Sequence, residues 1–138
     1  AGAVDRIHFD IDRSRIVGNR LHNLKLANLA PVTRLTGRVQ NSDIGRSGGV
    51  NLSLERSLLI DAPRDAVLDF GGGALGSVGN NCFDGGGQRD LEIKGWSVSL
   101  RNNWWGQSSA PLWWRAPVVA GSAGFAPVAS AAPAHCER

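Results

Sequence analysis

The 138-residue chain has no methionine, no tyrosine, only two cysteines and no block of five charges of one sign. Its net charge of +3 is spread along the chain, which is weak evidence for a nucleic-acid partner, and we predict none. The longest uncharged stretch, residues 116–134, contains three prolines with several glycines and serines. Because a membrane helix tolerates this composition badly, we predict no membrane span.

Glycine is abundant, with 18 residues, and six prolines accompany it. A helical bundle avoids glycine inside its helices, so we exclude the all-α class. The hydrophobic fraction of 42% and the charged fraction of 20% indicate a folded globular protein, and the length suits one domain. The first residues lack the basic flank and apolar run of a signal peptide, so we expect a secreted form to have lost its signal already.

A six-residue pattern recurs five times: an aliphatic residue, two further residues, Ser or Asn, one residue, and a large apolar residue. It occupies residues 11–16, 39–44, 54–59, 78–83 and 100–105. The starts are 28, 15, 24 and 22 residues apart (39−11, 54−39, 78−54 and 100−78), a mean of roughly 22, as expected for the coils of a solenoid. Period-two alternation precedes most copies, which predicts strands with one inward face.

The two apolar anchors of each copy lie an odd number of positions apart, so the chain must bend between them for both to point inward. Small polar residues that adopt turn conformations cheaply occupy this bend. The predicted bend residues are Ser14, Ser42, Ser57, Asn81 and Asn103. With coils stacked about 4.8 Å apart, we expect Asn81 and Asn103 to exchange side-chain hydrogen bonds as an asparagine ladder.

We therefore predict an all-β fold, a parallel β-helix of about five coils over residues 1–110. Residues 111–138, rich in Pro, Ala and Gly, are expected to form an extended C-terminal strap. The segments 78–83, 91–93 and 98–106, with Pro111 nearby, carry a family resemblance. Above all, the Asn-Asn-Trp-Trp-Gly element at 102–106 resembles the last coil of right-handed parallel β-helix proteins of the pectate-lyase-like superfamily. The resemblance implies right-handed coils.

In that superfamily, polysaccharide lyases and hydrolases carry acidic and basic groups on outer faces, where carboxylates bind calcium or act as acids and bases. The resemblance makes Asp10, Asp12 and Arg38 the candidates for such a site, beside His8. We favour the alternative, a solvated face with an Asp10–Arg38 ion pair between coils. No histidine or cysteine has metal-site spacing, so we predict no metal and no cofactor.

The two cysteines are compatible with one disulfide or with two free thiols. Cys82 is expected to point out of its coil, where a returning tail would bring Cys136 to it, and we predict this bond. Closing a loop of 53 intervening residues stabilises a fold by about 4 kcal/mol in the chain-entropy model. A disulfide favours an extracellular or cell-surface location.

Of three further tryptophans, Trp104 is expected to point outward from its coil, and Trp113 and Trp114 lie on the strap. They could stack on sugar rings, but Trp113 and Trp114 could equally cover the apolar end of the last coil, and we favour the cover.

Solenoid ends expose unpaired backbone, and we expect no capping helix before the first coil, so either the chain is cut from a longer protein or another molecule completes that end. The sequence thus favours a noncatalytic extracellular structural or adhesive module, able to assemble end to end into a homo-oligomer or filament with Asp12 and Arg101 at the junction. The alternative is a carbohydrate-active enzyme or its sugar-binding fragment, with a polysaccharide as partner.

Overall fold

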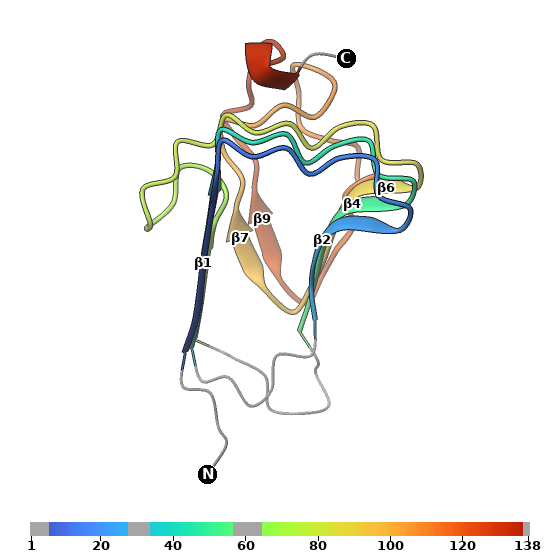
Figure 1. The fold of residues 1–138 in the computed structure, drawn as a ribbon. Coiled ribbons are helices and arrows are strands. Elements are labelled where there is room, and N and C mark those ends of the chain that lie inside the picture. The colour runs from blue at the N-terminus through green and yellow to red at the C-terminus, as the bar shows by residue number, and fades with distance from the viewer. Residues whose placement is uncertain (1–5, 28–33, 57–64, 137–138) are drawn as a thin grey trace.

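The fold is a parallel β-solenoid of about four turns, seen in a computed structural model that describes residues 6–27, 34–56 and 65–136 (Figure 1). Each turn contributes one strand to each of two parallel sheets. The first sheet contains β1 (Arg6–Asp12), β3 (Arg34–Gln40), β5 (Asp65–Asp69), β7 (Ser97–Ser99) and β9 (Ser122–Gly124). The second contains β2 (His22–Leu26), β4 (Val50–Glu55), β6 (Arg89–Lys94) and β8 (Val118–Val119). The predicted all-β solenoid is confirmed, with about four turns in place of five.

A third side closes each turn without a regular strand. Single parallel bridges connect Arg15 to Asp43, Asp43 to Cys82, and Cys82 to Trp104, one residue from each turn. Inside the three sides lies one apolar core, in which Leu35, Phe70 and Phe83 are fully buried.

The third copy of the sequence pattern is not a coil of its own. Leu54 lies in β4 and pairs with Leu26 and Ile93 in the second sheet, so it belongs to the same turn as Val39. The expected bend at Ser57 lies outside the described residues. The anchor proposed at Val78 is also wrong, because this side chain is 55% exposed. Phe70 is instead the buried apolar residue before this bend, and the loop 71–78 lies between Phe70 and the bend at Asn81.

The bends lie where the sequence places them in the other four copies. The residue before each bend residue has a positive φ: 49° at Arg13, 51° at Asn41, 59° at Asn80 and 61° at Asn102. Asparagine tolerates this left-handed conformation better than most residues, which explains three of the four. The residue that follows then points its side chain toward the neighbouring turn.

Hydrogen bonds join the bend residues of successive turns into one column, which we call the bend ladder. It consists of Ser14, Ser42, Asn81 and Asn103. The Ser42 backbone N–H donates to Asn81 Oδ1 at 2.9 Å, and Asn81 Nδ2 donates to Asn103 Oδ1 at 3.0 Å. Asn103 Nδ2 also donates to the carbonyls of Phe70 and Leu100. Since both amides are fully buried, these bonds satisfy groups that water cannot reach.

A second polar column, which the sequence reading missed, follows the second sheet. It consists of Asn23 in β2, Asn51 in β4 and Asp90 in β6, and we call it the strand column. Asn51 Oδ1 accepts a hydrogen bond from Asn23 Nδ2 at 3.3 Å, and Asn51 Nδ2 donates one to Asp90 Oδ1 at 3.4 Å. Asn51 Nδ2 also donates to the Phe83 and Asp84 carbonyls. The column therefore anchors the loop that leads into β6.

The C-terminal segment differs from a simple strap. Residues after 110 supply β8 and β9, which pair with β6 and β7 and continue both sheets. The chain then crosses the third side, where Asn102 N–H donates to the Pro127 carbonyl, and ends in the short 3-10 helix η1 (Ala134–Cys136) outside that side (Figure 1). There Cys136 forms the expected disulfide with Cys82.

Asn103→Leu should lower the free energy of unfolding by about 1–3 kcal/mol, because it leaves buried carbonyls without a donor. Ser109→Leu changes an exposed loop residue and serves as the control. Urea midpoints of the two variants decide the matter, and equal midpoints would contradict the role given to the bend ladder.

Candidate functional site

The residues singled out for acid–base chemistry form an ion pair between turns. Asp10 and Arg38 face each other in the first sheet, and Arg38 Nη2 lies 2.6 Å from Asp10 Oδ2. This hydrogen bond raises the pKa of Arg38. Asp12 accepts a hydrogen bond from Asn41 Nδ2 at 3.1 Å, which lowers the pKa of Asp12 and favours its ionised form. His8 Nδ1 is 2.6 Å from Thr36 Oγ1. The polar groups of this face are thus engaged with one another.

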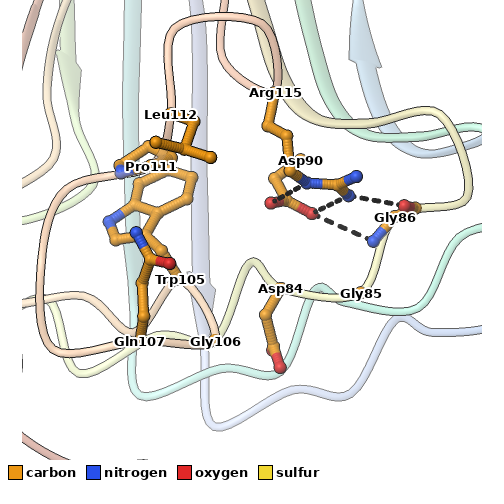
Figure 2. A pocket seen from close by; sticks show the side chains of 10 residues that line it. All are labelled: Asp84, Gly85, Gly86, Asp90, Trp105, Gly106, Gln107, Pro111, Leu112 and Arg115. Atoms are coloured by element: carbon orange, nitrogen blue, oxygen red, sulfur yellow. Dashed lines mark hydrogen bonds and ion pairs between the residues drawn. The ribbon is translucent and has the colours of Figure 1, made fainter.

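A pocket of about 340 Å³ lies instead where the loop before β6 meets the chain between β7 and β8 (Figure 2). Its walls come from three separate segments of the chain. The lining residues are Asp84, Gly85, Gly86, Asp90, Trp105, Gly106, Gln107, Pro111, Leu112 and Arg115. Figure 2 shows an apolar side formed by Trp105, Pro111 and Leu112, opposite a polar side formed by Asp90 and Arg115.

The polar side is an ion pair at the last position of the strand column. Arg115 Nε donates to Asp90 Oδ2 and Arg115 Nη2 donates to Asp90 Oδ1, both at 2.9 Å. Arg115 Nη2 also donates to the Gly86 carbonyl at 2.6 Å, while the Gly86 N–H donates to Asp90 Oδ1 at 3.0 Å. The hydrogen bond with Asp90 raises the pKa of Arg115. Since Asp90 is only 2% exposed, this pairing is what makes a buried carboxylate tolerable.

The apolar side is continuous with the core. The Trp105 ring packs 5.1 Å from the Phe83 ring and 5.3 Å from the Phe125 ring, which fixes its orientation. Gly106 follows with a φ of 86°, and an added Cβ there would lie 3.3 Å from Asp84 Cβ. The glycine of the Asn-Asn-Trp-Trp-Gly element therefore lets the chain turn at the edge of the pocket.

An exposed aromatic turn follows this apolar side. Trp113 is 81% exposed and Trp114 is 49% exposed, next to Leu112 of the pocket wall. The Arg115 guanidinium lies 5.4 Å from the Trp114 ring centre, which links the turn to the polar side of the pocket. The expectation that Trp113 covers the last coil is wrong, because a covering side chain would be buried. Trp104, the third candidate for sugar stacking, lies away from this turn in the bridges of the third side.

The residues expected at an end-to-end junction lie at different depths in the stack. Asp12 belongs to β1, the edge strand of the first sheet. Arg101 belongs to the turn of β7, and the chain passes beyond it, with Leu100 N–H donating to the Gly124 carbonyl. The last strand of the first sheet is therefore β9, so stacked copies would present β9 and not Arg101 to Asp12.

Sequence reasoning missed Asp90, Arg115 and the pocket they form. A signal for the strand column was present, because an Asn-Leu or Asp-Leu pair recurs at Asn23, Asn51 and Asp90, early in each strand. Nothing local marks Arg115, which reaches Asp90 from 25 positions along the chain. Its place depends on how residues 106–115 cross the pocket.

Comparison with known proteins finds no match to this chain among family models, curated proteins or solved structures. Within residues 6–27, 34–56 and 65–136, no helix has the length and apolar character needed to cross a membrane.

Arg115→Ala should lower the free energy of unfolding by about 3–5 kcal/mol, because it leaves the buried Asp90 carboxylate uncompensated. The control is Arg89→Ala, which breaks an exposed pair with Glu92 and should cost less than about 1 kcal/mol. Urea denaturation of both variants measures the difference. Similar losses in the two would show that the Asp90–Arg115 pair does not hold the pocket together.

Proposed function

We propose that this chain is a noncatalytic extracellular module that adheres to polysaccharide through the pocket and the exposed turn at Trp113 and Trp114. One observation carries the proposal. Trp113, a large apolar side chain, is 81% exposed directly beside a pocket of about 340 Å³ with fixed polar groups. A single exposed apolar side chain is ordinary, but Leu112, Trp113 and Trp114 are exposed together, and a contiguous apolar patch beside a concave site is typical of ligand recognition.

A sugar ring matches both halves of this surface. Its C–H face stacks on an aromatic ring, and its hydroxyl groups donate to and accept from polar side chains at its edge. The pocket offers the Gln107 amide and backbone groups of the glycine-rich loop. Gln107 already orients its amide toward the Ala110 carbonyl at 2.9 Å, so the loop that carries it is partly preorganised.

The engagement of the carboxylates supports a binding role over catalysis. Both Asp90 oxygens accept from Arg115, and Asp10 is held by Arg38 in the same way. A glycosidase needs one carboxyl group free to donate a proton and a second one to act as base or nucleophile. The carbohydrate-active alternative, with Asp10, Asp12 and Arg38 as its residues, is therefore the less supported one.

The Cys82–Cys136 disulfide supports an oxidising, extracellular setting. The parallel solenoid, together with the Asn-Asn-Trp-Trp-Gly element, supports kinship with the pectate-lyase-like superfamily. A noncatalytic member of that group would keep the scaffold and a sugar-contacting surface without the chemistry.

Trp113→Ala should weaken binding to a retained polysaccharide about tenfold or more, corresponding to about 1.4 kcal/mol. Affinity electrophoresis in gels containing neutral and acidic polysaccharides measures this retention, and Val119→Ala, which removes another exposed apolar side chain, is the control. Binding without release of reducing ends supports the proposal. Failure of the wild type to bind any polysaccharide of the panel, or undiminished binding by Trp113→Ala, would contradict it.

A second candidate function, end-to-end assembly of copies of this chain, is favoured by the first described turn, which we call open because its apolar side chains are only partly buried. Ile7, Phe9 and Ile11 face the core from β1 but are only partly buried, whereas Leu35 and Val39 in the next turn are fully buried. β1 is an edge strand at this end and β9 is the edge strand at the other. Parallel pairing of β9 from one copy with β1 of the next would continue the sheet and bury the open turn.

Ile11→Lys and Ala123→Lys should each raise the protein concentration needed for assembly about tenfold or more, because each places a charge on one of the two joined ends. Val78→Lys, at an exposed loop position in a middle turn, is the control. Sedimentation velocity over a range of concentrations gives the result. A monomeric wild type would exclude assembly, and an effect of Ile11→Lys alone would replace the head-to-tail arrangement with a pairing of two first turns.

A further inference from the structure

The fold brings together three potential metal ligands whose spacing in the sequence resembles no metal motif. Cys82 Sγ, Cys136 Sγ and a ring nitrogen of His135 all lie within 4.8 Å of one another. In the oxidised chain the two sulfurs are bonded to each other, so neither is a thiolate ligand. We propose that reduction of this disulfide converts the cluster into a binding site for a thiophilic divalent cation, with zinc as the best fit.

The distances suit a zinc ion. Zinc lies about 2.3 Å from a cysteine sulfur and about 2.0–2.1 Å from a histidine nitrogen, so tetrahedral ligand atoms are roughly 3.5–3.8 Å apart. The histidine nitrogen lies within 4.8 Å of both sulfurs, so a movement of about 1 Å or less brings it to this separation. After reduction, the two sulfurs need only separate to the same distance, which side-chain rotation can supply.

One ligand is fixed and two are adjustable, which helps the site to form. Cys82 is held in the solenoid, where its N–H donates to the Ser42 carbonyl at 3.0 Å and its carbonyl accepts from Ile44 at 2.8 Å. His135 and Cys136 belong to η1, where the Cys136 N–H bonds to the Pro133 carbonyl within the same turn of chain. The helix can therefore shift against the coil without breaking the sheets.

Access and charge also suit the ion. His135 is exposed and lines a cavity of about 370 Å³ together with Arg13, Arg15 and Asp43, so an ion reaches the imidazole from solvent, beside the two buried cysteines. Arg15 Nε and Arg46 Nη2 lie 3.9 Å and 3.8 Å from the Asp43 carboxylate, on the turn next to Cys82. The Asp43 carboxylate, which pairs with both guanidinium groups, offsets their repulsion of a cation.

The donor set determines the class of metal. Two thiolates and one imidazole favour Zn²⁺, Co²⁺ or Cd²⁺ over Ca²⁺ and Mg²⁺, which prefer oxygen ligands. A water molecule can complete a tetrahedron around the three protein ligands. Cys82 and Cys136 would then be connected in both redox states, by a disulfide under oxidising conditions and through the metal ion under reducing ones.

The reaction balances with a trialkylphosphine as reductant. The phosphorus gives two electrons to the disulfide, the S–S bond breaks, and water supplies the oxygen of the phosphine oxide and the two protons of the thiols. Zinc then displaces one proton from each thiol, so two protons are released for each ion bound. The imidazole binds through its neutral form.

The test is a titration of the 138-residue chain with Co²⁺, followed by displacement with Zn²⁺, before and after phosphine reduction and removal of the phosphine. The reduced wild type should bind one ion per chain with a thiolate charge-transfer band, and the oxidised chain should show none. His135→Ala should weaken zinc binding about tenfold or more. His22→Ala, which removes a histidine of β2, is the matched control and should bind as the wild type does.

Near-ultraviolet circular dichroism of the tryptophans reports whether the reduced chain stays folded. If reduction alone unfolds it, zinc should restore the native spectrum, because an ion bound by the native state shifts the equilibrium toward folding. Absence of stoichiometric binding by the reduced wild type would overturn the proposal, and so would equal zinc affinity of His135→Ala and His22→Ala.

Discussion

Three turns of this solenoid bend at fully buried residues, Ser42, Asn81 and Asn103, where backbone N–H and carbonyl groups cannot reach water. The bend ladder meets this constraint, because Asn81 and Asn103 give their amide groups to buried carbonyls of their own and neighbouring turns. The strand column does the same along the second sheet through Asn51. With these polar groups paired, apolar side chains fill the remainder of the interior.

The pocket is a consequence of the strand column reaching the last turns. Its final carboxylate, Asp90, needs a cation in place of another amide, and Arg115 supplies it from the chain that leads into β8. Holding Arg115 there also holds the residues before it, which include the exposed turn at Trp113. The interaction that satisfies the interior thus places the aromatic surface at the pocket, so fold and candidate binding site share one set of contacts.

The two ends of the solenoid differ in how well their apolar side chains are covered. At the C-terminal end the chain adds β8 and β9, crosses the third side and is fastened by the Cys82–Cys136 bond. At the other end, the apolar side chains of β1 remain partly exposed. The proposed sugar-binding surface and the proposed assembly surface at β1 therefore occupy different parts of the stack, so one molecule can carry both.

Local periodicity determined the class of fold, the inward faces of the strands and the bends at Ser14, Ser42 and Asn103, because each depends on residues close together in the chain. The sequence alone could not assign Leu54 to a sheet, since apolar and polar residues alternate in the same way in the strands of both sheets. The lengths of the loops between the strands are also not readable from the sequence. Long loops likewise concealed the pairing of Asp90 with Arg115. Only the tertiary structure, by fixing which turn lies on which, decided where the pocket forms and that His135 meets the two cysteines.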